Sequence, residues 1–338
     1  MISEFAVPRK ADLSDTSTYS EFVSKIIREA VPVGTYQRSL TTLAAAIIKG
    51  QNELALHFLP FISCNSVGGD PEKAVFITAA WQFIRLAAKL LDDVEDGEIR
   101  DSSAKTINLG TGFLFAAHTA LGKLIESGIS CELANSVIAR FNHVCLHTCA
   151  GQDEDLSFRW NQRIPTPDDW IKVALAKSGM LFAWASWAGS VVAGVDKELQ
   201  NALWEYGLHL GVLVQIADDY KGTWNTMYNS DLCYKAVTLP LSYAYFVASS
   251  EEKEILLHLL QEANQGETRS ISKARDLISD LGAQRFVLAA AQIQRYRAIE
   301  MISPSHLSRY GSQKLIALLN EAFPVLVHLP GIPNENNS

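Results

Sequence analysis

The apolar residues of this chain recur at a spacing of about 3.6 positions over nearly its whole length, and this pattern constrains the fold most. Such spacing predicts α-helices, and no stretch alternates between apolar and polar residues as a half-exposed strand does. Helix start and stop signals separate the segments, as in GGDPEKA before residue 75 and PTPDDW before residue 171. Helices are predicted at residues 17–29, 36–50, 71–95, 108–127, 131–150, 167–194, 197–224, 236–248, 251–264, 270–282 and 284–302.

The composition supports one large all-α protein whose long helices surround a deep central cavity. The chain has 338 residues, of which 48% are hydrophobic and 20% are charged, so it can bury a sizeable core. No internal repeat, low-complexity tract or flexible linker interrupts it. We therefore expect a single domain over residues 1–338, with frayed ends at 1–15 and 330–338.

Charge and cysteine usage indicate a cytoplasmic protein that does not bind nucleic acid. The net charge of −8 provides no basic field for a nucleic acid. The N-terminus has no apolar core of the signal-peptide type, and no segment reaches roughly 18–20 uninterrupted apolar residues, so no membrane span is expected. The five cysteines lack metal-type spacing and are predicted to be buried free thiols of a reducing cytosol.

The stretch KLLDDVEDGEIRDSS, residues 89–103, carries a dense acidic cluster after a long apolar run. If residues 71–96 are helical, Asp92 and Asp96 share one face and Asp93 flanks them. Carboxylates this close raise one another's pKa values unless a cation neutralises them. Mg²⁺ suits such oxygen ligands, because it takes one or two carboxylates together with phosphate oxygens and waters. The alternative is a solvated acidic helix end.

A second acidic cluster, GVLVQIADDYKGTW, places Asp218 and Asp219 at the end of another apolar helix. Two acidic helices that face each other can hold several Mg²⁺ ions around a diphosphate. In such a site the cations stabilise the leaving pyrophosphate, and an apolar cavity shelters a carbocation from water. The two clusters together favour this chemistry over two solvated helix ends.

These motifs resemble those of the trans-isoprenyl diphosphate synthases, the polyprenyl synthetase family, from about residue 36 to residue 325. The resemblance implies the isoprenoid synthase fold, an allylic prenyl diphosphate substrate and a homodimer. Five elements occur in the family's order, namely LLDDVEDG, GQDEDL at 151–156, KSGMLF at 177–182, QIADDY at 215–220 and SDLCYKAVTLPL at 230–241.

Residue by residue, the resemblance implies a metal site and a diphosphate site. Three Mg²⁺ ions would be held with the diphosphate by Asp92, Asp96 and Asp218, with Asp93 and Asp219 in support. The allylic diphosphate would be bound by cations, because Lys and Arg give charge-assisted bonds to phosphate oxygens. The substrate-side residues are Lys177, Arg100, Gln215 and Lys235, with Gln152 and Asp155 behind them. Lys235 matches less well, because it stands one residue further from the threonine of TLP.

The chain departs from the family where the second substrate, isopentenyl diphosphate, is bound. Anchored on Pro60, the segment ALHFLP stands where the family has GKRxRP. Leu56 and Leu59 replace its lysine and second arginine, and His57 replaces its first arginine. Asp101 replaces the second arginine of an RR pair. Since desolvating a diphosphate without cations is costly, this pocket is predicted to be largely dismantled.

Two further departures leave alternatives open. Arg85 stands where the family has a histidine, and with Lys89 it shares the helix face of the first acidic motif. It either binds a diphosphate in an altered way or neutralises the aspartates as part of an i, i+4 ladder. Gly222 replaces the third aspartate of the second motif, so the remaining metal ligand is expected to be water, Thr223 or Asn225.

The residues before the first motif bear on the length of the substrate. Ala87 and Ala88 stand where the family's short-chain enzymes carry bulky residues, which predicts a deep pocket for a C20 or longer chain. Phe83 or Trp81 would close it lower down. The other interpretation is that alanine is simply a good helix former.

Three functions are consistent with these residues. The sequence favours a terpene synthase, or cyclase, that ionises one long allylic diphosphate, because the metal motifs are present and the second-substrate motif is lost. The first alternative is a chain-elongating prenyl diphosphate synthase with an altered second site. The second alternative is a non-catalytic subunit of such a synthase, against which the retained carboxylates argue.

Overall fold

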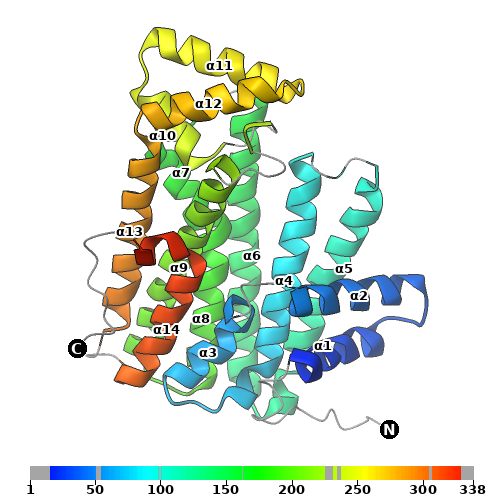
Figure 1. Cartoon of the computed structure of the whole chain (residues 1–338). Coiled ribbons are helices and arrows are strands. Elements are labelled where there is room, and N and C mark those ends of the chain that lie inside the picture. Colours follow the sequence, from blue (N-terminus) through cyan, green and yellow to red (C-terminus); the bar gives the residue numbers. More distant parts are fainter. Residues whose placement is uncertain are drawn as a thin grey trace. The chain divides into compact units, whose positions relative to one another are not determined.

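The computed structural model describes residues 16–50, 55–97, 99, 101–161, 163–224, 231–233, 237–303 and 307–328, and every regular element in these ranges is helical (Figure 1). This confirms the predicted all-α class. The α-helices are α1 (Thr16–Ala30), α2 (Thr35–Gly50), α3 (Leu59–Ser66), α4 (Val75–Glu95), α5 (Ser103–Gly122), α6 (Cys131–Trp160), α7 (Pro167–Ala174), α8 (Met180–Val192), α9 (Lys197–Trp224), α10 (Leu239–Val247), α11 (Ser250–Asn264), α12 (Thr268–Asp280), α13 (Ala283–Met301) and α14 (Arg309–Ala322). Shorter helical turns are η1 (Ala55–Phe58), η2 (Pro71–Ala74), η3 (Leu124–Ser127), η4 (Leu175–Gly179), η5 (Asp231–Cys233) and η6 (Pro324–His328).

The predicted helices agree with these elements, with four differences. Helix α5 begins and ends five residues before the predicted segment 108–127, whose last residues form the turn η3. The predicted segment 167–194 is divided into α7, the π-helical turn η4 and α8. Helix α6 continues ten residues beyond the predicted end at 150. Helices α3 and α14 were not predicted, because α3 has only 8 residues and is too short to show a period.

Contacts within the chain divide it into two compact units, each built from separate stretches of sequence. Unit 1 comprises Met1–His143, Trp184–Trp204 and Ile302–Leu318. Unit 2 comprises Val144–Ala183, Glu205–Met301 and Leu319–Ser338. The single domain remains a prediction, and the predicted frayed ends lie outside the described residues.

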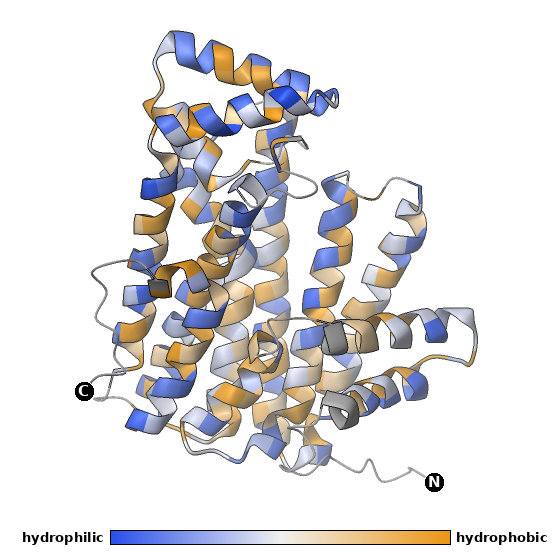
Figure 2. Cartoon of the chain, in the orientation of Figure 1, coloured by the Kyte–Doolittle hydropathy of each residue, from blue (hydrophilic) through white to orange (hydrophobic). Residues whose placement is uncertain are grey.

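Helix α4 is the core helix of unit 1. It runs beside α5 in Figure 1, and the Phe83 ring stacks on Phe113 of α5 with centroids 6.0 Å apart. The stretch Pro71–Glu95 is long and apolar enough to cross a membrane, but 72% of its most apolar window is buried inside the protein, as in a core helix. Its charged residues lie toward its C-terminal end, which is bluer in Figure 2.

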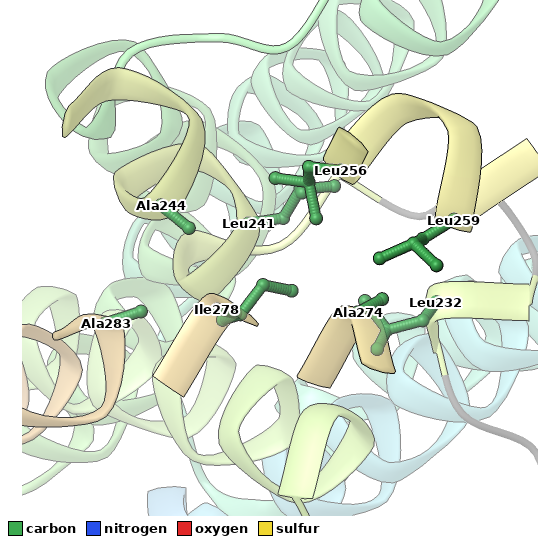
Figure 3. Close-up of a cluster of buried hydrophobic side chains, with 8 residues drawn as sticks. All are labelled: Leu232, Leu241, Ala244, Leu256, Leu259, Ala274, Ile278 and Ala283. Atoms are coloured by element: carbon green, nitrogen blue, oxygen red, sulfur yellow. The ribbon is translucent and has the colours of Figure 1, made fainter. Parts of the chain in front are cut away.

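A cluster of buried side chains holds the upper helices of unit 2 together (Figure 3). Leu241 of α10, Leu256 of α11 and Ile278 of α12 point toward one another there. Leu232 of the short turn η5 joins them and is 2% exposed. Burying a leucine side chain contributes about 2 kcal/mol, so the cluster anchors η5, including Asp231 next to Leu232, to these helices.

Four cysteine side chains are described, and all four are free thiols. Cys64 is buried, as predicted, and burial together with the charge of Asp70 raises its pKa to about 12. Cys131 and Cys149 are exposed, so the prediction of buried thiols is wrong for these two. The cytoplasmic location remains a prediction.

Candidate functional site

The first acidic motif forms the last turn of α4. The N–H of Asp96 donates to the carbonyl of Asp92 over 2.8 Å, which closes this turn. Gly97 follows with a φ of +77°, a left-handed conformation that ends the helix and that glycine adopts without strain. The glycine of LLDDVEDG therefore places Asp92, Asp93 and Asp96 at a helix C-terminus.

This position favours a bound cation. The carbonyls at a helix C-terminus carry about half a negative charge, which adds to that of the carboxylates. Asp92, Asp93 and Asp96 are all partly exposed. Lys89 donates to Asp93 over 3.0 Å, as the ladder interpretation predicted. Asp92 and Asp96, on one face, offer the one or two carboxylates that Mg²⁺ takes beside phosphate oxygens, so the donor set fits this ion.

In unit 2, Lys177 lies in the π-helical turn η4. Its ammonium group is 3.3 Å from Oδ2 of Asp155, which also accepts a hydrogen bond from Arg159 over 3.0 Å. Asp155 is 7% exposed, and a carboxylate buried to this degree needs opposite charges beside it. Lys177 and Arg159 supply them. The GQDEDL and KSGMLF motifs thus meet in one ion cluster, in which Asp155 holds the Lys177 ammonium group. The roles of both residues toward a substrate remain predictions.

Gly151 makes this meeting possible. A Cβ at this position would lie 2.8 Å from the backbone nitrogen of Lys177 and 2.8 Å from the Ala176 Cβ. Only glycine allows α6 and η4 to approach so closely. Gly211 does the same for α9, since its Cβ would lie 2.8 Å from the Ser178 carbonyl oxygen.

A chain of hydrogen bonds then joins three motifs within unit 2. Ser178 donates to the Gln215 side-chain oxygen over 2.8 Å, and the Gln215 amide donates to Asp219 over 3.2 Å. The other Asp219 oxygen accepts the Leu239 N–H over 2.7 Å. Gln215, predicted near the diphosphate, therefore links the turn of Lys177 to the second acidic motif and to the TLP segment.

The two aspartates of the second motif have different environments. Asp219 is 5% exposed, and burial raises the pKa of its carboxyl well above the usual range, while the Leu239 N–H opposes the shift. The Asp218 side chain is 60% exposed and lies 3.7 Å from Lys221. Asp218 is thus the more exposed carboxylate of this motif, whereas Asp219 accepts hydrogen bonds from Gln215 and from the Leu239 N–H. Their roles at a metal remain predictions.

Asp231 is a residue that the sequence did not single out. Its carboxylate occupies the space next to Gly222, where a Cβ would collide with it. The missing third carboxylate of the motif is thereby replaced in space by one from η5. Thr223, predicted as a substitute, is 0% exposed, and Asn225 lies outside the described residues. The only signal in the sequence was a glycine at 222 followed by an aspartate nine residues later.

The segment ALHFLP is part of the core of unit 1. Leu56 and Leu59 are 0% exposed, and the Leu56 carbonyl accepts the indole N–H of Trp81 over 2.9 Å. The carbonyl of Pro60 packs against Gly189, whose missing side chain makes room for it. These positions therefore bear no cation toward a ligand, as the exchanges to leucine predicted.

The residues predicted to set the chain length lie in or beside the core. Ala87 is 2% exposed and Ala88 is partly exposed. Phe83 and Trp81, predicted to close the pocket, are both 0% exposed. Phe83 lies one turn below Ala87 on the same helix face, where it could end a pocket. The pocket and its length remain predictions.

Some predicted residues remain untested by the geometry. Arg100 and Lys235 lie outside the described residues. Gln152 is partly exposed on α6. Within the described ranges, no three His, Cys, Asp or Glu side chains converge as a ready-made metal site.

Comparison with solved structures shows that the helices form the isoprenoid synthase fold. A geranylgeranyl pyrophosphate synthetase from Pyrococcus horikoshii superimposes with a TM-score of 0.76 at 20% identity, over 91% of this chain and 97% of that one. A polyprenyl synthase from Caulobacter crescentus, complexed with calcium and isoprenyl diphosphate, has a TM-score of 0.75 at 23% identity, over 93% and 94% of the two chains.

The chain belongs to the polyprenyl synthetase family, whose profile matches residues 21–278. A short chain isoprenyl diphosphate synthase from Methanothermobacter thermautotrophicus is 26% identical over 285 residues, which are 81% of this chain and 86% of the relative. A geranylgeranyl diphosphate synthase from Mycobacterium tuberculosis is 28% identical over 238 residues, 66% of this chain and 67% of the relative. The predicted family is therefore confirmed. It is a family of prenyltransferases that typically use Mg²⁺.

Proposed function

We propose that this protein is a chain-elongating trans-prenyl diphosphate synthase, which joins an allylic prenyl diphosphate to isopentenyl diphosphate. The observation that carries the proposal is the family membership, together with relatives that are named as synthases of this kind. It reverses the order that the sequence alone favoured, in which a cyclase came first. Elongation and cyclisation begin with the same ionisation, so the acidic motifs support either.

In the proposed reaction, the two acidic motifs hold the metal ions. Asp92 and Asp96 on α4, and Asp218 on α9, are the ligands, and Asp93 and Asp219 support them. Three Mg²⁺ ions are expected to neutralise the diphosphate as it leaves. The Caulobacter crescentus structure supports the use of divalent cations for this purpose, because that protein is complexed with calcium and isoprenyl diphosphate.

The other residues of unit 2 bind and orient the allylic substrate. Lys177 supplies a positive charge to a phosphate oxygen, and the buried Asp155 holds its ammonium group in place. Gln215 keeps the turn of Lys177 in register with Asp219. Arg100 and Lys235 are assigned to the diphosphate by resemblance alone.

Product length follows from the residues before the first motif. Ala87 and Ala88 leave more room than bulky side chains would, so we expect a product of C20 or longer. Phe83, which is packed against Phe113, is the residue expected to end the pocket.

A cyclase remains the second candidate, because the buried Leu56 and Leu59 remove the family's second-substrate cations. Incubation with geranylgeranyl diphosphate and Mg²⁺, with and without isopentenyl diphosphate, separates the candidates. Elongation predicts a longer diphosphate only when both substrates are present. A hexane-extractable hydrocarbon or alcohol formed without isopentenyl diphosphate would identify a cyclase, and no turnover in either mixture would favour a non-catalytic subunit.

We expect a homodimer, as in the family. Helix α5 presents two large exposed apolar side chains, Ile107 at 45% and Phe115 at 65% exposure. Apolar side chains of this size gather at subunit interfaces. Sedimentation velocity should show a dimer for the unmodified protein and a shift to monomer for Phe115→Asp if α5 forms the interface. A wild-type monomer would contradict the expectation.

A further inference from the structure

Helix α13, orange in Figure 1, packs against other elements of unit 2 on two neighbouring sides. On one side, the Gln294 side-chain oxygen lies 2.8 Å from Nδ1 of His209 on α9. On the other, Arg295 donates to the side chain of Asn320, in the part of α14 that belongs to unit 2, over 3.1 Å. Successive helix positions differ by about 100° in direction, so the face opposite Gln294 and Arg295 points away from both partners.

This opposite face is apolar along its middle. Ile293 and Tyr296 lie on it, three positions apart, and are 50% and 60% exposed. Phe286 precedes Ile293 by seven residues, two helical turns, so it stands in the same row. The Phe286 ring stacks on Tyr243 of α10 with centroids 4.1 Å apart, which continues the row onto α10.

The end of α10 extends the row further. Phe246 and Val247 follow Tyr243 by three and four positions, so they lie one turn further along the same side of α10. They are 62% and 43% exposed. Several large apolar side chains exposed together mark a contact with another protein or with a membrane. We call this surface the outer face; it comprises Tyr243, Phe246, Val247, Phe286, Ile293 and Tyr296.

Exposed arginines flank the outer face on α13. Arg285 and Arg297 lie on opposite sides of the row of Ile293 and Tyr296, near the two ends of the helix. Glu300 shares this side of α13 at its C-terminal end. In a chain whose net charge is −8, two arginines therefore border an apolar row. Their charge is complementary to that of an anionic surface.

A bilayer surface fits this pattern better than a second copy of the chain. Amphipathic helices lie in the membrane interface with an apolar row facing the acyl chains and basic residues at its borders. Arginine stems extend along the apolar region while their guanidinium groups reach the lipid phosphates, and tyrosines gather at this depth. A two-fold contact between two copies of α13 would instead bring Arg285 of one near Arg297 of the other, which repel.

We propose that the outer face binds the surface of a bilayer that contains anionic phospholipids. The inference goes beyond the proposed function, and only the purpose of the contact rests on that function. A product of C20 or longer is an amphiphile, because every buried CH₂ group favours its transfer from water into the bilayer. A synthase held at the bilayer would release this product where it partitions.

Vesicle flotation of the full chain, without substrate or metal, tests the proposal. The wild type should float with vesicles of phosphatidylcholine and phosphatidylglycerol in equal parts, and much less with phosphatidylcholine alone. Binding should weaken as the salt concentration rises, because salt screens the arginines from the lipid phosphates. Equal binding to both kinds of vesicle, or binding to neither, would overturn the proposal.

Two variants with matched controls locate the contact. Arg285→Gln/Arg297→Gln should lower the affinity for the anionic vesicles by about 10- to 30-fold, as expected for two cations at an anionic surface. Arg38→Gln/Lys73→Gln, which removes two exposed cations of unit 1, should bind as the wild type does.

Tyr296→Asp should lower the affinity by about tenfold or more, because it places a charge in the apolar row. Tyr310→Asp is its control, since Tyr310 of unit 1 is 65% exposed and lies outside the outer face. If all four variants bind alike, the outer face is not the contact. Conversion of a wild-type dimer to a monomer by Tyr296→Asp in sedimentation velocity would make the face a subunit interface and overturn the proposal.

A measurement on the wild type does not depend on the folding of any variant. Anionic vesicles should slow hydrogen exchange in peptides from α13 and leave those from α6 unchanged; the absence of protection in α13 would refute the contact. The outcomes also separate this inference from the proposed function. Vesicle binding through the outer face without formation of a longer diphosphate would refute the function and leave the surface. Elongation without vesicle binding would refute the surface alone.

Discussion

The region around Lys177 in unit 2 keeps the residues of the family's motifs, whereas the region around His57 in unit 1 departs from them. In unit 2, Ser178, Gln215, Asp219 and the Leu239 N–H form a continuous chain of hydrogen bonds. Near His57, buried leucines replace two cations, and the remaining charge lies on α4. In a connected network each single exchange leaves a buried group unpaired, whereas the exchanged leucines near His57 pack as part of the apolar core.

The largest effect expected in unit 2 comes from removing the exposed metal carboxylate. Asp218→Ala should lower product formation by about a thousandfold or more, because a cation that neutralises the leaving diphosphate is lost. Turnover of the allylic substrate with Mg²⁺ measures this. Glu205→Gln, an exposed change on the same helix, is the control. Unchanged turnover of Asp218→Ala would refute its assignment as a metal ligand.

The close approach of α6 to η4 is broken by Gly151→Ala. The added methyl group would lie 2.8 Å from the backbone nitrogen of Lys177, so the backbone of one of the two elements must shift. We expect the free energy of unfolding to fall by about 1–3 kcal/mol and kcat to fall by about tenfold or more as Lys177 moves.

Denaturant unfolding and steady-state kinetics measure both effects of Gly151→Ala. Gly122→Ala is the matched control, because nothing lies within 4 Å of the Cβ that it adds. If both variants behave alike, the close contact does not position Lys177.

The pH dependence of stability tests whether His57, whose Nδ1 lies 3.3 Å from Nη1 of Arg85, is neutral in the folded protein. The unfolded chain binds a proton at His57 below about pH 6.5, whereas the folded protein does not until about pH 3. Because the unfolded state binds more protons than the folded state in this window, the free energy of unfolding falls as the pH falls. At pH 5 this group should cost about 2 kcal/mol of the free energy of unfolding.

The His57→Asn variant isolates this contribution. Its side-chain oxygen can accept a hydrogen bond in the place of Nδ1, and it does not titrate. The group acts between about pH 6.5 and pH 3. Urea unfolding between pH 7.5 and pH 5, which covers the upper part of this range, should show a smaller loss of stability for the variant than for the wild type. Parallel curves would show that His57 is protonated in the folded protein.

The smallest effect concerns the carboxylate next to Gly222. In Gly222→Ala, the new methyl group displaces the Asp231 carboxylate, which can rotate aside, so stability should change by less than about 1 kcal/mol. The Mg²⁺ concentration for half-maximal turnover should rise by about tenfold, as for other groups that support metal ligands.

A second substitution tests whether Asp231 is responsible. Asp231→Ala should raise the Mg²⁺ requirement by a similar amount, and the double variant should show little further effect. Titration of Mg²⁺ into the protein with inorganic pyrophosphate gives a second readout. Additive effects would mean that the two residues act independently.

Much of the fold and of the candidate site could be predicted from the residues. The 3.6-residue spacing predicted α9 to the residue, and Gly97 ends α4 where the acidic motif requires it. Asp218 and Lys177 are predicted as site residues because their motifs occur in the family's order. The comparison with relatives favours elongation over the cyclase that the sequence favoured, because relatives that match most of the chain are named as synthases, whereas the sequence preference depended on one missing motif.

The sequence by itself determined the helices, the acidic motifs and the family, because periodicity and motif chemistry are local properties. Only the tertiary structure decided that Asp231 fills the space at Gly222, that Asp219 faces the Leu239 N–H, and that His57 meets Arg85. These partners belong to different elements, and no periodicity of the chain specifies which of them meet. Their contacts depend on how closely the helices pack. A glycine such as Gly151 permits a short distance between α6 and η4, but the sequence does not show that these two elements are neighbours.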